Sequence, residues 1–315
     1  MTRQLIHHLT RFVLLGAALA CLSALGLAQV TPPANAPPPS VISDYKPGSV
    51  LFYPKYTSNP SAPQQGDTQI NITNTNTNLD ITVHLFAIDG SSCSVADSLI
   101  SLTPNQTASL LMSDFDPGVT GYLVGIAVAD GPTQFNYLIG DEFIRESDGR
   151  QANLQAIAVA KFTAGSVVPD PDGGASLLFN GTEYEKLPSQ IGLSSFNSQV
   201  TDSTQVNLFV PSNNLLFGIP SSTTSIFTLV YDDVENVFST TVRVACYTTF
   251  NVSSLRITGG VNTKIPAGRT GWIRFDGSGR PILGFAQTRG PVFNGGHNLH
   301  VLRLLPSYTI VVPSF

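Results

Sequence analysis

Two histidines near the C-terminal end have a spacing that can serve metal chemistry. His297 and His300 lie in the stretch Gly-Gly-His-Asn-Leu-His. Zinc binds neutral imidazoles, and histidines three residues apart share one face of a helix. The residues that follow, 301–305, read as a strand, and positions three apart on a strand point to opposite faces. We therefore interpret His297 and His300 as candidate binding residues at a turn or sheet edge, and we predict no metal and no other cofactor.

The single tryptophan is the side chain best suited to stack on a sugar ring. Trp272 lies in Gly-Trp-Ile-Arg-Phe, where the alternation of side chains predicts a strand. This pattern favours a place in the core or on a sheet face, and a sugar-binding platform is the second interpretation. Trp272, His297 and His300 together form the set of candidate binding residues.

Acidic residues are sparse, so adjacent carboxylates stand out as candidates for acid–base catalysis. Glycoside hydrolysis needs two carboxylates about 5–10 Å apart across a cleft. Asp141-Glu142 and Asp232-Asp233 are neighbours in the sequence, and neighbours on a strand point to opposite faces. Neither pair can serve alone, so no catalytic residue is predicted. A hydrolase would need acids from both halves of the chain to meet in an interdomain cleft.

Other signatures of catalysis are missing from the sequence. It contains no Gly-x-Ser-x-Gly motif, no phosphate-binding loop and no dinucleotide fingerprint. The acidic loop 170–172 does not continue with the ligand spacing of a calcium-binding EF-hand. Lysine and arginine do not cluster, which argues against a nucleic-acid partner. We therefore predict that the protein is not an enzyme.

Two cysteines lie outside the N-terminal segment, and their surroundings differ. Cys93 lies in the loop Ser-Ser-Cys-Ser, whereas Cys246 follows the alternating stretch 241–245 and is expected in the core. A disulfide requires the two Cα atoms to lie within about 7 Å of each other. The different local patterns predict no bridge, with Cys246 buried, although exported proteins commonly oxidise their cysteines.

The N-terminal segment has the pattern of an export signal. Two arginines and no acidic residue accompany an apolar stretch, and Gly26-Leu-Ala28 is a small-residue cleavage site. We predict a signal peptide over 1–28 and a Pro-rich disordered linker over 29–47. Cys21 leaves a lipoprotein signal as an alternative. The mature chain is expected to have no transmembrane span, and to be secreted, at the cell surface or in the periplasm.

Charged residues make up only 12% of the chain, about half the usual share, and the net charge is −5. Ser, Thr, Asn and Gln must therefore cover much of the surface, as in the run 71–78. A polar surface with few charges suits an extracellular scaffold.

Short strands separated by turns dominate the pattern. Residues 122–128 are almost continuously apolar and predict a central strand, whereas four other segments alternate and predict strands with one buried face. The alternating segments are 69–73, 82–86, 225–231 and 241–245. Helix is expected to be scarce, and Gln151 to Phe162 is the best candidate by the spacing of its apolar residues. The sequence therefore predicts an all-β fold of antiparallel sandwiches.

Similar blocks recur along the chain in the same order. The stretch 123–132, Leu-Val-Gly-Ile-Ala-Val-Ala-Asp-Gly-Pro, has a counterpart at 282–291, Ile-Leu-Gly-Phe-Ala-Gln-Thr-Arg-Gly-Pro. The other matched blocks are 49–52 with 176–179, 68–71 with 204–207, 83–89 with 226–232, and 102–104 with 264–266. A repeat of this length predicts two copies of one domain.

The boundary between the copies is expected at a Gly- and Pro-containing segment. Residues 165–174 have the composition of a linker. We therefore predict two tandem related β-sandwich domains, immunoglobulin-like or jelly-roll-like, over 48–164 and 175–315.

Several short motifs of the chain resemble those of a family of exported bacterial all-β proteins for which no activity is known. The motifs are Cys93-Ser-Val-Ala-Asp97, Leu102-Thr-Pro-Asn-Gln-Thr107, Asp116-Pro-Gly-Val-Thr-Gly-Tyr122, Phe135-Asn-Tyr-Leu-Ile-Gly-Asp-Glu142 and Gly296-His-Asn-Leu-His300. The resemblance covers nearly all of the mature chain and implies export and an all-β fold. Members of the family carry a second cysteine just before the Leu-Thr-Pro-Asn block. Ser101 occupies that place here, so the local disulfide that the family implies lacks its partner.

These observations together favour a non-enzymatic role outside the cytoplasm. We expect a structural or adhesive module of the cell surface or extracellular space, with a polysaccharide or a surface protein as its partner. The alternative is a secreted carbohydrate-active hydrolase or carbohydrate-binding protein with its site in the interdomain cleft.

Overall fold

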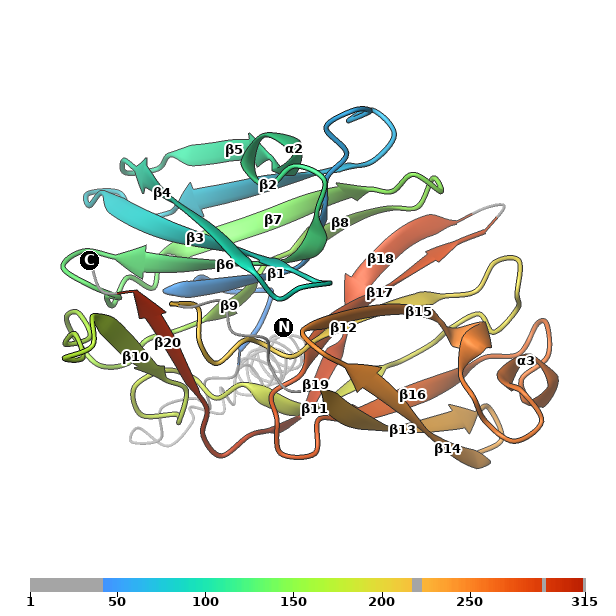
Figure 1. The fold of residues 1–315 in the computed structure, drawn as a ribbon. Coiled ribbons are helices and arrows are strands. Elements are labelled where there is room, and N and C mark those ends of the chain that lie inside the picture. The colour runs from blue at the N-terminus through green and yellow to red at the C-terminus, as the bar shows by residue number, and fades with distance from the viewer. Residues whose placement is uncertain (1–41, 217–222, 291–292, 314–315) are drawn as a thin grey trace, which may run out of the picture. The chain divides into compact units, whose positions relative to one another are not determined.

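Antiparallel strands form nearly all of the regular secondary structure, as Figure 1 shows. The computed structural model describes residues 42–216, 223–290 and 293–313. Residues 41–315 form one compact unit. The all-β fold of antiparallel sandwiches predicted from the sequence is confirmed. The predicted signal peptide over 1–28 lies outside the described residues.

The first half of the fold, residues 50–159, contains two sheets. The five-stranded sheet has the order β4 (Val95–Leu102), β3 (Ile81–Asp89), β6 (Thr120–Val128), β1 (Val50–Thr57) and β9 (Ile157–Val159). The four-stranded sheet has the order β5 (Thr107–Leu111), β2 (Asp67–Asn74), β7 (Leu138–Arg145) and β8 (Gln151–Gln155). Alternation directs Ile70 and Ile72 of β2 inward, where they pack with Leu51, Val83 and Leu123 between the sheets.

The second half, residues 188–304, contains two further sheets. The five-stranded sheet has the order β14 (Val237–Val244), β13 (Thr224–Asp232), β16 (Gly271–Asp276), β11 (Pro188–Leu193) and β19 (His300–Leu304). The four-stranded sheet has the order β15 (Tyr247–Asn251), β12 (Gln205–Phe209), β17 (Leu283–Arg289) and β18 (Asn294–Asn298). Val206, Leu208, Ile226 and Ile273 belong to the core of this half. The short helices are α2 (Met112–Phe115), η1 (Val252–Ser254) and α3 (Val261–Lys264).

The strand order is the same in the two halves. Adding ten to each strand number of the first half gives the order of the second half, for both sheets. The matches of 68–71 with 204–207 and of 83–89 with 226–232 fall on the corresponding strands β2 and β12, and β3 and β13. This agreement is what a tandem duplication would produce, and the duplication itself stays a prediction.

The most conspicuous sequence match was aligned wrongly. Residues 123–132 include most of β6, which lies inside a five-stranded sheet, whereas 282–291 include β17, which lies inside a four-stranded sheet. The strand that corresponds to β6 in sheet order is β16. A short apolar run with one glycine suits any buried strand, so this similarity does not identify the place of a strand in the sheet. The matches of 49–52 and 102–104 also pair segments at different places in the fold.

Two glycines at the same place in the two halves indicate which strands correspond, and they do so more reliably than the match of 123–132 with 282–291. Gly121 and Gly271 each lie in a Thr-Gly-aromatic sequence at the start of β6 and β16. A Cβ on Gly121 would lie 1.8 Å from the carbonyl oxygen of Ile88, and a Cβ on Gly271 would lie 1.9 Å from that of Tyr231. Only glycine permits this close approach of two strands.

The predicted helix Gln151–Phe162 is wrong. The segment contains β8 and β9, which are edge strands of the two sheets of the first half. Burial alternates along β8, with Ala152 and Leu154 inside and the residues between them exposed. The apolar spacing of this short segment fits a helix and two strands equally well, and pairing with β7 and β1 decides for strands.

The outer face of the five-stranded sheet in the first half is buried by a further pair of strands. In the first half this face carries Phe52, Tyr122 and Val124, which are buried in a cluster that also contains Ala175 and Ile310. The latter two belong to β10 (Gly174–Leu178) and β20 (Thr309–Pro313), which form a two-stranded sheet. Burial on both faces explains why β1 and β6 read as continuous apolar runs.

The two cysteines form a disulfide, which corrects the prediction of unpaired thiols. Cys93 and Cys246 are bonded, with their Cα atoms 5.8 Å apart. Both residues are buried, so the expected burial of Cys246 is confirmed. The local patterns of a loop and a strand end could not show that these segments of different halves meet.

The segment before β1 is part of the folded unit from residue 42 onward. Ile42 is buried, and Ser43 forms a β-bridge with Ala158. The prediction of a disordered linker over 29–47 is therefore wrong for residues 42–47, and its earlier part lies outside the described residues. No helix among the described residues is long and apolar enough to cross a membrane.

Candidate ligand-binding pocket

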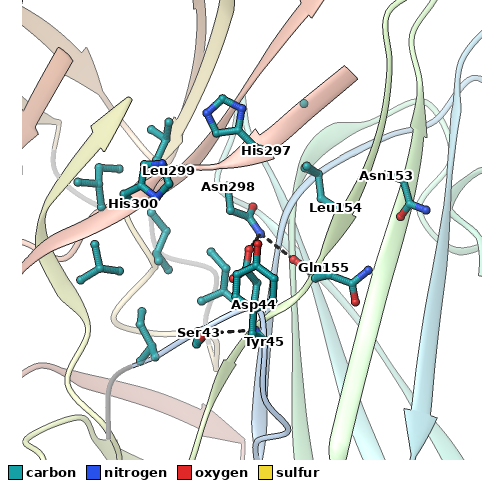
Figure 2. Close-up of a pocket in the computed structure, with 17 residues that line it drawn as sticks. Ser43, Asp44, Tyr45, Asn153, Leu154, Gln155, His297, Asn298, Leu299 and His300 are labelled. Atoms are coloured by element: carbon teal, nitrogen blue, oxygen red, sulfur yellow. Dashed lines mark hydrogen bonds between the residues drawn. The ribbon is translucent and has the colours of Figure 1, made fainter. Parts of the chain in front are cut away.

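A pocket of about 360 Å³ lies where β8 of the first half meets β18 and β19 of the second half. Its polar lining includes side chains from three parts of the chain (Figure 2). They are Asp44 and Tyr45 from the segment before β1, Asn153 and Gln155 from β8, and His297, Asn298 and His300 from β18 and β19.

Asparagine side chains join the two edge strands that frame the pocket. Asn298 Nδ2 donates hydrogen bonds to the Gln155 carbonyl oxygen, at 2.8 Å, and to Asp44 Oδ2, at 3.0 Å. Figure 2 shows Asn298 between these two partners. Farther along, Asn294 Oδ1 accepts a hydrogen bond from the backbone N–H of Gln151 at 3.0 Å. Side-chain amides thus take the place of a backbone ladder between β8 and β18.

The pocket contains a buried amide oxygen that has no partner. Asn298 Oδ1 is inaccessible to solvent and makes no hydrogen bond with any described residue. A buried acceptor without a donor is unfavourable by about 1–3 kcal/mol.

The two predicted histidines lie together in this pocket. The ring centroids of His297 and His300 are 6.2 Å apart, with the planes tilted by 36°. Desolvation, together with the nearby charge of His300, lowers the pKa of His297. His297 is therefore neutral at neutral pH and presents one donor and one acceptor nitrogen.

Asp44 and Tyr45 complete the polar wall from the N-terminal side. The backbone N–H of Tyr45 donates to Ser43 Oγ at 3.1 Å, and the Tyr45 side chain is 89% exposed. An exposed ring beside amides, imidazoles and one carboxylate is a common setting for the binding of polar, uncharged molecules, because the ring offers a stacking face and the other groups offer hydrogen bonds.

The described residues offer no obvious metal centre. Within 42–216, 223–290 and 293–313, no group of three or more His, Cys, Asp or Glu side chains is placed to hold a metal ion. His297 and His300 lack a third such ligand in this part of the chain.

Trp272 lies outside the pocket lining, on the outer face of the five-stranded sheet of the second half. It is 37% exposed and stacks on Tyr231, with ring centroids 4.2 Å apart and planes inclined by 2°. The structure thus brings two of the three predicted binding residues together and separates the third from them.

The adjacent acidic pairs do not line the pocket either. Asp232 accepts hydrogen bonds from the backbone N–H groups of Val234 and Asn236, as a turn-forming aspartate does, and Asp233 pairs with Arg269. Glu142 is fully buried, and its neighbour Asp141 accepts a hydrogen bond from an asparagine across the sheet. Asp44 is the one carboxylate among the pocket-lining residues.

Sequence reasoning missed the contributions of Asp44, Tyr45, Asn153 and Gln155. The first two fell within the predicted linker and the other two within the predicted helix. Alternation over 151–155 was the available signal for an edge strand, and no local pattern marked Asp44 and Tyr45.

Comparison with known proteins adds no assignment: the chain matches no protein-family model and no curated protein sequence.

Proposed function

We propose that the protein is an exported, non-enzymatic structural or adhesive module that binds a polysaccharide in the pocket between β8 and β18. The observation that carries the proposal is the lining itself, which combines amide and imidazole side chains with one carboxylate and an exposed tyrosine. Hydroxyl groups of a neutral sugar both donate and accept hydrogen bonds, so they match this mixture of partners.

Three features support a place outside the cytoplasm. The disulfide between Cys93 and Cys246 joins segments of the two halves, and disulfides persist in oxidising compartments. The low share of charged residues, 12%, agrees with a surface of hydroxyl and amide groups. The N-terminal sequence supports export by its signal-like pattern.

The pocket lining has only one carboxylate, which favours binding over hydrolysis. A glycosidase uses two carboxylates on either side of the bond that it cleaves. Among the residues that line this pocket, Asp44 alone carries a carboxylate, and its oxygen Oδ2 accepts a hydrogen bond from Asn298.

Isothermal titration with neutral oligosaccharides of glucose, mannose and N-acetylglucosamine tests the proposal. His297→Ala and Asn153→Ala should weaken the binding of the sugar that the wild type recognises by about tenfold, because each removes a hydrogen bond of about 1 kcal/mol or more. Trp272→Ala is the matched control, since it removes an exposed aromatic ring outside the pocket.

Two results would overturn the proposal. One is the absence of binding to any of the oligosaccharides. The other is binding that Trp272→Ala abolishes and that the pocket variants leave unchanged, which would move the site to the outer sheet face. Release of reducing ends during incubation would instead identify a hydrolase.

A further inference from the structure

A lysine of the first half is buried against an asparagine of the second half. Lys55 is only 2% exposed, and its Nζ lies 3.4 Å from Asn207 Oδ1. Lys55 follows Pro54 at an irregularity in the pairing of β1 with β6, between Tyr53 and Tyr56. The irregularity interrupts the strict alternation of β1 and lets Lys55 turn toward β12 of the other half.

The amide group of Asn207 is held with its carbonyl oxygen polarised. Asn207 is fully buried, and Oδ1 accepts hydrogen bonds from the Tyr247 hydroxyl at 2.8 Å and the Thr249 hydroxyl at 2.7 Å. Nδ2 has no hydrogen-bond partner among the described residues. Donors on the oxygen stabilise negative charge there, as in an oxyanion hole, and the amide nitrogen is not tied to another group.

Two glutamates of β7 and the following turn complete this cluster. Glu146 accepts hydrogen bonds from Lys55 Nζ and from Gln287 Nε2. Glu142 is fully buried, and its carboxyl interacts with the backbone N–H and the charge of Lys55. We name this set the Lys55–Asn207 cluster; its members are Lys55, Glu142, Glu146, Asn207, Tyr247 and Thr249.

We propose that Lys55 and Asn207 form an intramolecular isopeptide bond that links the two halves of the protein covalently. The Lys55 ammonium first transfers a proton to Glu146. The neutral Nζ then attacks Asn207 Cγ, the Nζ–Cγ bond forms, and the Cγ–Nδ2 bond breaks. The displaced amino group takes up protons from Glu146 and from Nζ and leaves as ammonium. Atoms and charge balance without an oxidant, a reductant or a second substrate.

The electrostatics of the cluster favour this reaction. Burial lowers the pKa of Lys55, which favours the neutral amine that acts as nucleophile. Burial also raises the pKa of Glu142 well above its ordinary value, which weakens the negative charge that would otherwise favour the ammonium form of Lys55. The Tyr247 hydroxyl keeps its proton, because burial raises its pKa as well. Fixed geometry in a dry site replaces the chance encounter of an amine and an amide.

The first half contains a natural comparison for Asn207. Asn71 holds the corresponding place on β2, and its Oδ1 likewise accepts a hydrogen bond from a hydroxyl, that of Ser109. Asn71 is only half-buried, and its Nδ2 donates to Asp141 at 2.8 Å. The amide nitrogen of Asn71 is therefore engaged, and no lysine hydrogen bond to its amide is among the described contacts.

Intact mass spectrometry of the exported full chain, denatured and reduced, tests the proposal. The wild type should be lighter than its sequence by one ammonia molecule. Lys55→Met and Asn207→Ala should each show the full mass, whereas the control variants Lys161→Met and Asn71→Ala should keep the deficit. Lys161 is a suitable control because it is buried as well, and its Nζ donates to Thr163.

Peptide mapping decides where the ammonia was lost. Trypsin should fail to cleave the denatured wild type after Lys55, and a chymotryptic digest should contain a branched peptide that joins Lys55 to Asn207. In Asn207→Asp the same branched peptide should form with loss of water. Wild type of full mass would overturn the proposal. A deficit that maps to cyclised Gln29 at a new N-terminus, or to a succinimide, would overturn it equally. These measurements do not need folded variants, because the wild type alone decides.

Discussion

Three polar side chains are buried close together where the two halves of the chain meet. Glu142, Lys55 and Asn207 are all inside, and Nδ2 of Asn207 lacks a hydrogen-bond partner among the described residues. Buried polar groups lower the free energy of unfolding unless each finds a partner. These three groups lie together, and the reaction of Lys55 with Asn207 would convert two of them into a neutral amide.

Replacing Glu142 should make the protein more stable at neutral pH. The folded-state pKa of Glu142 is raised above its ordinary value of 4.5, so the folded protein keeps a proton that the unfolded chain has lost. This group's contribution to stability therefore falls as the pH rises from 4.5 through the folded-state pKa. Glu142→Gln removes this dependence and should raise the free energy of unfolding at pH 7 by about 1–3 kcal/mol.

Urea denaturation at several pH values measures this effect. The exposed Glu235→Gln serves as the control and should leave the free energy of unfolding within about 0.5 kcal/mol of the wild type. A Glu142→Gln variant that loses stability at neutral pH would show that the carboxylate is ionised and useful where it lies.

At the scale of the elements, corresponding strands meet different surroundings in the two halves. Tyr122 on β6 and Trp272 on β16 occupy the same place in their sheets. Tyr122 is fully buried and stacks on Phe209, with ring centroids 4.4 Å apart, whereas Trp272 remains partly exposed beside Tyr231. The two-stranded sheet of β10 and β20 belongs to the cluster that buries Tyr122.

Truncating these two aromatic residues should therefore have unequal effects. Tyr122→Ala should lower the free energy of unfolding by about 3–5 kcal/mol, as expected for a large buried ring. Trp272→Ala should lower it by only about 0.5–1.5 kcal/mol, the range for one exposed aromatic pair. Thermal or chemical denaturation of both variants checks the difference, and equal losses would mean that the outer face of the second half is covered in solution.

How far the sequence predicts these elements depends on whether the signal is local. Alternation at Ile70 and Ile72 predicted a strand, because the period of side chains along a strand is a local property. The helix over Gln151–Phe162 was predicted wrongly, because a few apolar residues at helical spacing cannot report pairing with β7. His297 and His300 could be singled out by type and spacing, although their meeting with β8 depends on contacts between distant segments.

Long-range contacts explain the other errors. The loop around Cys93 and the strand end at Cys246 look unrelated in sequence, and their meeting follows from the packing of the two halves. The match of 123–132 with 282–291 was misleading because strands that are buried on both faces by distant segments become similar in composition, whatever their place in the sheet.

At the scale of the whole molecule, the two halves are joined at several places. The disulfide, the Lys55–Asn207 cluster and the asparagine contacts between β8 and β18 all connect them. The pocket takes its lining from both halves, so its shape depends on their remaining together. The proposed binding site would thus be positioned by rigid strands and by the disulfide.

The disulfide should be present in the purified protein and contribute to its stability. Before reduction, the protein expressed from residue 29 should take up no alkylating reagent under denaturing conditions, and after reduction it should be alkylated at Cys93 and Cys246. The double variant Cys93→Ser and Cys246→Ser should lose about 2–5 kcal/mol of stability. Alkylation of both residues without reductant would contradict the bridge.

Hydrogen–deuterium exchange with and without a bound oligosaccharide tests the proposed binding site most directly. Saturating ligand should slow the exchange of backbone amides in 151–157 and 294–301, which frame the pocket, and should leave β13 and β16 unchanged. The account predicts this protection for the sugar identified by titration. Protection centred on Tyr231 and Trp272, with none at β8 and β18, would contradict it.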